Sequence, residues 1–192
     1  MKFKITKTFN KLIIYDFDDT LVSTNAKIKI IKKNGEILEL NSSEYSNYTH
    51  QADDEIDFSD FRQSKLVEPK ITELFDKKFI NDMLDDEADV AILTARPSIE
   101  QLVEFFYVIL PELGYNFTKD ELRRINFISI GKDAHTGEIA AKKKKEWINQ
   151  QIFKYGYDSV TFYDDSEQNI KFVDELKDEW SNIDIKTVKI DA

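Results

Sequence analysis

Short apolar runs along this chain alternate with longer segments in which apolar residues recur every three or four positions. The short runs are continuous, as is typical of strands buried on both faces of a sheet. The longer segments have the spacing of one apolar helix face. Predicted strands cover residues 12–15, 89–93, 125–130, 159–163 and 183–190, with an edge strand over residues 1–8. Predicted helices begin at Pro69, at Pro97, after the capping box that starts at Thr118, at Ile139 and before Ile170.

This alternation predicts an α/β fold, with a mainly parallel, Rossmann-like sheet in a three-layer sandwich. Ligands of such sheets bind beyond the carboxyl ends of the strands, near the point where the strand order switches. Three predicted strands end in chemically suggestive residues: Asp16-Phe17-Asp18, Thr94-Ala95-Arg96 and Asp164-Asp165. These ends meet if the strand at residues 12–15 lies between those at 89–93 and 159–163, and we therefore expect that order.

Residues 22–68 do not follow the alternation, and we expect a small insertion there within a single domain of residues 1–192. Its first part alternates apolar and polar residues around Asn34-Gly35, which predicts a hairpin of residues 26–33 and 36–40 with a type I′ turn. The remainder is polar and aromatic with little periodicity. There we expect a short helix starting at Ser42 or Ser43, followed by irregular chain.

Composition narrows the chemistry. The absence of cysteine excludes disulfides, thiolate zinc sites and thiol nucleophiles. With only two histidines, a metal site must use oxygen ligands, which suits Mg²⁺. The net charge of −10 disfavours an extended nucleic-acid surface. No apolar run approaches the ~20 residues that span a bilayer, and residues 1–8 lack the apolar core of a signal peptide, so we expect a cytoplasmic protein without a membrane partner.

Three carboxylates, Asp16, Asp18 and Asp19, crowd directly after the first apolar run. Carboxylates this close repel one another unless they share a cation or a proton. A lone Asp-x-Asp is more often a loop with a helix cap, so this pattern alone does not define a site. The polar ends of the other two strands strengthen it.

Asp16-Phe17-Asp18-Asp19-Thr20 resembles the Asp-x-Asp-x-Thr signature of the haloacid dehalogenase (HAD) superfamily. The later motifs of that family also occur here in order: a threonine after an apolar strand, a lysine near a helix start and an acidic pair after another strand. The resemblance covers about residues 11–180. It implies a HAD-type sheet, a small cap within residues 22–68, and Mg²⁺-dependent hydrolysis of a phosphomonoester through an aspartyl-phosphate.

The resemblance also implies roles for single residues. Asp16 would attack phosphorus, and Asp18 would protonate the leaving oxygen and then activate water. The backbone carbonyl of Asp18 would also bind Mg²⁺, and an Asp at this position is what phosphatases of the superfamily carry. Thr94 and the Ala95 amide would hydrogen-bond the phosphate. Arg96 would contact the substrate or the cap, or merely cover the helix end.

A lysine would neutralise Asp16 and the transferring phosphoryl group. Residues 142–145 are four consecutive lysines on one predicted helix, and at ~100° per residue they cannot all face one site. Lys143 and Lys144 lie one turn before two apolar residues that mark the buried side. Both are candidates, with Lys143 preferred, and Lys132 is a more distant alternative.

Asp165 would supply the remaining carboxylate to Mg²⁺ beside Asp16. Asp164 would bind the ion directly, bind it through a water molecule, or only contact a residue that binds it, and these alternatives stay open. Asn169 occupies a position where some relatives carry a further Asp or Asn. Otherwise Ser166 and the acidic pair would simply cap the following helix.

The resemblance does not identify the substrate. A small phosphorylated molecule is the leading expectation, and a small cap would leave the site open, so a nucleotide or polynucleotide 3′-end phosphatase is the first alternative. Aromatic residues of the insertion would stack on a base or simply pack in a core; these are Tyr45, Tyr48, Phe58 and Phe61. The alternative of another class is a binding protein that kept the fold without turnover.

Overall fold

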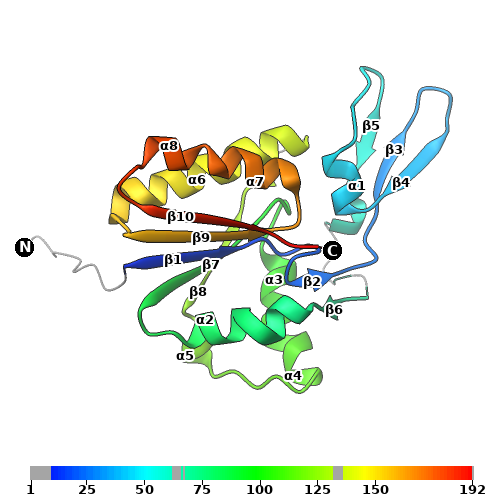
Figure 1. The fold of residues 1–192 in the computed structure, drawn as a ribbon. Coiled ribbons are helices and arrows are strands. Elements are labelled where there is room, and N and C mark those ends of the chain that lie inside the picture. Colours follow the sequence, from blue (N-terminus) through cyan, green and yellow to red (C-terminus); the bar gives the residue numbers. More distant parts are fainter. Residues whose placement is uncertain (1–9, 62–65, 67, 132–135, 192) are drawn as a thin grey trace, which may run out of the picture.

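Five parallel strands form the central sheet of the computed structural model, which describes residues 10–61, 66, 68–131 and 136–191 (Figure 1). In chain order they are β1 (Lys11–Tyr15), β7 (Ala88–Thr94), β8 (Ile125–Ser129), β9 (Ser159–Asp164) and β10 (Asp184–Lys189). Their order in space is β10-β9-β1-β7-β8. As predicted, β1 lies between β7 and β9, so the carboxyl ends of these three strands meet at one edge. The edge strand expected at residues 1–8 lies outside the described residues.

Alternate residues of β1 divide the core between the two faces of the sheet. Ile13 and Tyr15 face one helical layer, whereas Leu12 and Ile14 face the other. The first layer contains η2 (Phe75–Phe79), α2 (Ile80–Leu84), α3 (Glu100–Glu104), η3 (Phe105–Ile109), α4 (Leu110–Glu112) and α5 (Lys119–Leu122). The second contains α6 (Gly137–Tyr155), α7 (Glu167–Asp174) and α8 (Leu176–Glu179). A three-layer α/β sandwich results, as predicted (Figure 1).

The chain between β1 and β7 leaves the central sheet as an insertion, residues 22–71. At its base, β2 (Val22–Ser23) pairs with β6 (Lys70–Ile71). Beyond this pair lie β3 (Ile28–Ile31), β4 (Ile37–Leu40), α1 (Ser42–Ser46), β5 (Glu55–Asp57) and η1 (Ser59–Phe61), with the strands in the order β4-β3-β5. A small core of its own contains Ala26, Ile28, Ile30, Tyr45 and Phe61. The three-stranded sheet stands beyond the carboxyl end of β1 (Figure 1).

The prediction of a helix from Pro69 is wrong, because the next two residues form β6. That helix begins after Thr72, whose hydroxyl accepts a hydrogen bond from the Phe75 amide at 3.4 Å. Pairing with β2, almost fifty residues earlier in the chain, overrides the local helix signal. The structure therefore starts the helix at a hydroxyl cap and not at the proline.

The helix predicted from Pro97 also starts late, at Glu100. The Glu100 amide donates to the Ser98 hydroxyl at 3.2 Å, which satisfies one of the free amides of the first turn. The capping box predicted before the following short helix is confirmed. Thr118 Oγ1 accepts from the Glu121 amide at 3.2 Å, and the Glu121 carboxylate accepts from the Thr118 amide at 2.6 Å.

The predicted hairpin is present as β3 and β4, but its turn is not type I′. That turn needs a positive φ at both central residues, and of Asn34 and Gly35 only Gly35 has one, +83°. The Gly35 amide donates to the Lys32 carbonyl, and the Lys32 amide donates to the Glu36 carbonyl, each at 2.8 Å. A longer loop with one left-handed glycine closes the hairpin. Strand β5 lies in the segment that we expected to be irregular. With three residues it is too short to show the alternation of apolar and polar residues that predicts a strand.

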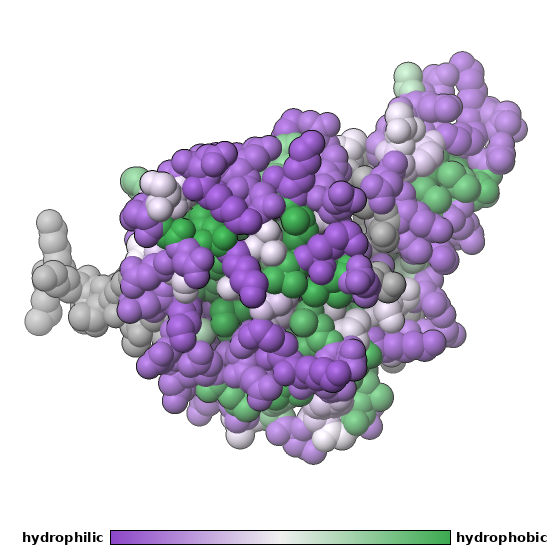
Figure 2. All heavy atoms as spheres, viewed as in Figure 1, coloured by the Kyte–Doolittle hydropathy of each residue, from purple (hydrophilic) through white to green (hydrophobic). Residues whose placement is uncertain are grey.

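Hydrophilic residues predominate on the face shown in Figure 2, with smaller apolar areas between them. This distribution agrees with a chain in which 33% of the residues are charged. Across the part of the chain that the structure describes, no helix combines the length and the apolar character needed to cross a membrane.

Candidate active site

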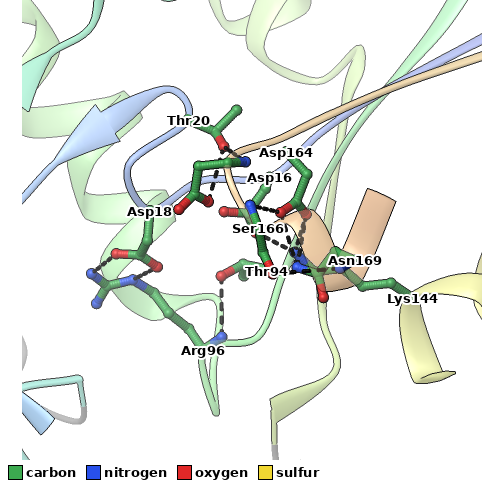
Figure 3. Close-up of polar contacts among 10 residues, drawn as sticks. Asp16, Asp18, Thr20, Thr94, Arg96, Lys144, Asp164, Ser166 and Asn169 are labelled. Carbon is green, nitrogen blue, oxygen red and sulfur yellow. Dashed lines mark hydrogen bonds and ion pairs between the residues drawn. The ribbon is translucent and has the colours of Figure 1, made fainter. Parts of the chain in front are cut away.

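The acidic turn after β1 is held by backbone hydrogen bonds. The Asp16 amide donates to the Tyr163 carbonyl of β9 at 2.9 Å, and the Phe17 carbonyl accepts from two amides further along the turn at 3.0 Å. Asp19 adopts a left-handed conformation with φ of +58°, which Asp tolerates better than most residues. The turn buries Asp16 and Asp18 at the carboxyl edge of the sheet, 5% and 9% exposed, between β7 and β9 (Figure 3).

Lys144 reaches these carboxylates from α6. Its Nζ lies 2.6 Å from Asp16 Oδ1 and 2.7 Å from Asp164 Oδ2, and its side chain is 1% exposed (Figure 3). One turn later, Ile148 is fully buried on the same face of the helix. Lys144 thus links the end of β1 to the end of β9.

The preference for Lys143 is wrong. Its side chain is half-buried, and its Nζ lies 3.5 Å from the Ile130 carbonyl oxygen instead of the carboxylates. The rotation of ~100° per residue separates it from Lys144. Lys142 pairs with Glu138 on the exposed face, as expected for a solvated lysine. Lys132 lies outside the described residues.

Both carboxylate oxygens of Asp164 accept hydrogen bonds. Oδ1 accepts from the Ser166 amide at 2.8 Å and from Asn169 Nδ2 at 2.9 Å. Oδ2 accepts from Lys144 at 2.7 Å and from Asn169 Nδ2 at 3.0 Å. Because one Asn169 nitrogen is shared by both oxygens, three donor groups hold this carboxylate. Asp164 therefore orients Lys144, and Ser166 caps α7, which is the helix cap that the sequence offered as the alternative to a metal site.

Thr20 joins the two acidic turns. Its buried Oγ1 accepts from the Asp165 amide at 3.1 Å and donates to Asp165 Oδ1 at 3.5 Å. Its backbone carbonyl accepts from the Thr72 hydroxyl at 2.7 Å, at the start of the helix that follows the insertion. The Thr20 hydroxyl therefore ties the turn after β1 to the turn after β9.

Three carboxylates surround a single ammonium group, so negative charge is in excess here. Oxygens of Asp16, Asp164 and Asp165 lie within 4.8 Å of one another, with one ammonium between them. Burial lowers the pKa of Lys144, but Asp16 and Asp164 outweigh this effect and raise it above its ordinary value. Burial, with further contributions from Asp164 and Asp165, raises the pKa of Asp16 well above its usual range despite Lys144. Burial, followed by Asp164, raises the pKa of Asp165 to about 7.

The oxygen donors fit a hard divalent cation. Mg²⁺ takes one or two carboxylates and completes its octahedron with water and phosphate oxygens. Asp16 and Asp165 both line the adjoining cavity, whereas Asp164 does not. The side chain of Asp18 is not part of this carboxylate group, and the resemblance assigned only its backbone carbonyl to the ion.

Arg96 holds Asp18 by a two-point ion pair. Its Nε donates to Asp18 Oδ2 at 2.9 Å and its Nη2 to Oδ1 at 2.6 Å (Figure 3). Thr94 is fully buried, and its hydroxyl accepts from the Arg96 amide at 3.1 Å. Ala95 and Arg96 line the cavity, but Thr94 is not among its described lining residues. The pairing of Arg96 with Asp18, 78 residues earlier, was not predicted, because no local pattern connects them.

A cavity of about 110 Å³ opens at this cluster. Its polar end contains Asp16, Asp18, Lys144 and Asp165. Its opposite wall comes from the insertion and is mainly apolar and aromatic, with Ile28, Tyr45, Phe58 and Phe61. The site thus joins a charged floor to an apolar wall from a different part of the chain.

Gly131 fixes the turn that carries Arg96, and sequence reasoning missed it. A Cβ at Gly131 would lie 1.8 Å from the Ala95 carbonyl oxygen and 2.6 Å from the Arg96 carbonyl carbon. Both are backbone atoms, so no rotamer change relieves the clash. We expect Gly131→Ala to lower the free energy of unfolding by roughly 3 kcal/mol or more, measured by urea denaturation.

Gly156→Ala is the control for that substitution. Gly156 has φ of +64°, but no atom lies within 4 Å of its Cβ position. It should cost only about 1 kcal/mol, from backbone conformation alone. Equal effects of the two substitutions would contradict the proposed clash.

Asp165→Asn should change how stability depends on pH. The folded-state pKa of Asp165, about 7, lies above the ordinary value of 3.8, so ionisation of this group disfavours the fold. Its contribution to stability is therefore complete below about pH 4 and is lost as the pH rises to about 7. In the presence of EDTA at pH 7.5, we expect Asp165→Asn to raise Tm by at least ~3 °C, with little gain at pH 4. Asp178→Asn, at an exposed site, is the control, and an equal rise at both pH values would contradict this account.

Comparison with known proteins adds a fold neighbour. No protein-family model matches the chain, and no curated protein matches its sequence. The crystal structure of the Legionella pneumophila effector Ceg4, with an N-terminal TEV protease cleavage sequence, is similar to the whole chain. The superposition covers 98% of this chain and 90% of that one, with 12% sequence identity and a TM-score of 0.51. At this identity the likeness concerns the fold alone.

Proposed function

We propose that this protein is a Mg²⁺-dependent phosphomonoester hydrolase of the HAD type, with the insertion as a small cap over the site. The observation that carries the proposal is the buried contact of Lys144 with Asp16 and Asp164 beside a cavity at the carboxyl ends of β1, β7 and β9. Burying an ammonium and its carboxylates costs desolvation free energy. Such groups, when they sit beside a cavity, are typical of functional sites. The order of the Asp-x-Asp-x-Thr, Thr, Lys and Asp-Asp motifs along the chain supports the same family.

The first step is attack of an Asp16 carboxylate oxygen on phosphorus. The new P–O bond forms as the ester P–O bond breaks. The leaving oxygen takes a proton from the protonated form of Asp18, which gives up one of its two contacts with Arg96 to carry that proton. The products of this step are the free alcohol and an aspartyl-phosphate. Lys144 stabilises the negative charge that the phosphoryl oxygens carry during transfer.

The second step is hydrolysis of the aspartyl-phosphate. Asp18 accepts a proton from a water molecule as the water oxygen attacks phosphorus. The bond between phosphorus and Asp16 breaks, which releases inorganic phosphate and restores both carboxyl groups to their starting states. Asp18 therefore serves as acid in the first step and as base in the second.

Asp16 and Asp165 would hold the cation, because both face the cavity. Mg²⁺ would neutralise the phosphoryl oxygens and orient the phosphate for in-line attack. Asp164 acts on Lys144 instead, since it is not among the described lining residues of the cavity and its oxygens accept from Lys144, Ser166 and Asn169. Of the three alternatives for Asp164, we thereby favour the one in which it contacts neighbouring residues and not the ion or its water.

A nucleotide or a polynucleotide 3′-end is the second candidate substrate beside a small phosphomonoester. The observation that favours it is the wall of Tyr45, Phe58 and Phe61 opposite the charged floor of the cavity. Aromatic rings stack on bases of any sequence. The net charge of −10 favours a nucleotide or a chain end over a long polymer.

The testing experiment is phosphate release from a panel of phosphomonoesters, with Mg²⁺ and with EDTA. The panel contains sugar phosphates, nucleotides, p-nitrophenyl phosphate and a 3′-phosphorylated oligonucleotide. Acid-quenched reactions are digested and analysed by mass spectrometry for a phosphoryl group on the peptide that contains Asp16. Mg²⁺-dependent release with this adduct is the expected result. Mg²⁺ binding without release from any member would favour the non-catalytic binding protein.

A further inference from the structure

Each nitrogen of the Arg96 guanidinium already donates one hydrogen bond, which engages three of its five N–H groups. Nε and Nη2 contact the two oxygens of Asp18, and Nη1 donates to Gln101 Oε1 of α3. The residue is 2% exposed although it lines the cavity. The Nε–Nη2 edge, which gives the two-point contact, is taken by Asp18, so a phosphate could gain that edge only by displacing the residue that the proposed reaction needs at the same time.

Two aromatic rings lie within cation–π distance of the guanidinium. The Phe17 ring centroid lies 5.5 Å from the guanidinium carbon, and the Phe61 ring centroid lies 4.9 Å from it. Phe17 belongs to the acidic turn, whereas Phe61 belongs to the small core of the insertion. Contacts of this kind contribute about 0.5–2 kcal/mol when water is excluded. The insertion therefore supports Arg96 directly.

We propose that Arg96 is a positioning residue that fixes the Asp18 carboxylate for both proton transfers, and that Phe61 and Gln101 keep Arg96 in place. The inference rests on the proposed phosphatase function and adds to it a mechanical link from the insertion to the acid–base group. A bidentate arginine fixes a carboxylate in orientation as well as in position. Without the fork, Asp18 can rotate about its side-chain bonds, and a misplacement of ~1 Å costs about a hundredfold in rate.

A double-mutant cycle in kcat tests the link. Arg96→Gln alone should lower kcat at least tenfold with a change in KM below about threefold. In an Asp18→Asn background, the same substitution should have almost no further effect, because the group that it positions is already lost. The loss should be larger for an alkyl phosphate than for p-nitrophenyl phosphate, whose leaving oxygen needs less protonation.

Phe61→Leu keeps Arg96 and tests the insertion's part. It should lower kcat, whereas Phe58→Leu, on the same wall but without the arginine contact, should change mainly KM. Arg124→Gln controls for the loss of an arginine far from the site, where Arg124 donates to the Leu84 and Asp85 carbonyls. It should leave kcat unchanged. If Arg96→Gln fails to fold, Phe61→Leu and the paired Asp18→Asn/Arg96→Gln variant still decide the question.

The outcomes separate the inference from the function it rests on. A rise in KM in both backgrounds would make Arg96 a phosphate ligand and overturn the inference. Equal losses of kcat in both backgrounds would make its role merely structural and also overturn it. Turnover that depends on Asp16 but ignores Arg96→Gln would overturn the inference alone, whereas turnover that survives Asp16→Asn would overturn the proposed function with it.

Discussion

Asp16→Asn is expected to reduce phosphate release by at least about a thousandfold, because an amide cannot attack phosphorus. The substitution preserves shape and removes one of three crowded carboxylates. Because burial raises the pKa of Asp16, its ionised form disfavours the fold, and the variant should be at least as stable as the wild type in EDTA. Steady-state phosphate release and thermal unfolding measure the two effects on the same sample. Loss of turnover would then not be a consequence of unfolding.

Asp19→Asn is the matched control, three residues along the same turn. Asn also tolerates the left-handed conformation that Asp19 adopts at φ of +58°. Asp19 is half-buried and lies outside the described lining of the cavity beside Asp16. It should retain most of the turnover. Comparable losses in the two variants would mean that the charge of the turn, and not a nucleophile at Asp16, supports the reaction.

Lys144→Met should damage both stability and turnover. It leaves Asp16 and Asp164 buried without their common counter-ion, and loss of one partner of a buried pair costs about 3–5 kcal/mol. For a chain of this size we expect Tm to fall by roughly 6–20 °C. Where enough protein folds to be assayed, kcat should fall at least a hundredfold, since the transferring charge loses its nearest protein cation.

Lys143→Met is the control, one residue away on the same helix. Lys143 contacts the Ile130 carbonyl and not the carboxylates, so its loss should change Tm by only a few degrees and leave turnover near that of the wild type. Added Mg²⁺ should recover part of the stability of Lys144→Met by screening Asp16 and Asp165. A larger effect at Lys143 than at Lys144 would contradict the contacts described above.

The central sheet could be predicted because its signals are local and agree with one another. Apolar strands alternate with amphipathic helices, and the polar ends of three strands had to converge for either metal or phosphate chemistry. The predicted helix start at Pro69 was wrong for the opposite reason, because the interaction that decides it is not local. The pairing of β6 with β2 depends on chain almost fifty residues away, and no local pattern carries that information.

The acidic residues of the site could be predicted as a set, but not the contacts among them. The run of four lysines identified the helix and the helical turn that face the site, but not which lysine reaches it. Trp147 and Ile148, one turn later, are both apolar, and only the structure shows that Ile148 is the more deeply buried of the two. The pair of Arg96 with Asp18 joins residues from different strand ends. It follows from the strand order and the fold of both turns together.

The β2–β6 pair has a consequence for engineering. Val22 opposes Ile71 and Ser23 opposes Lys70, so the two ends of the insertion are held side by side where they leave the α/β core. A segment closed at such a neck can change length cheaply, since doubling a flexible loop costs only about 0.6 kcal/mol. We therefore expect that a different segment can replace the insertion without disturbing the α/β core, provided that it keeps the β2–β6 pair and an aromatic residue against Arg96.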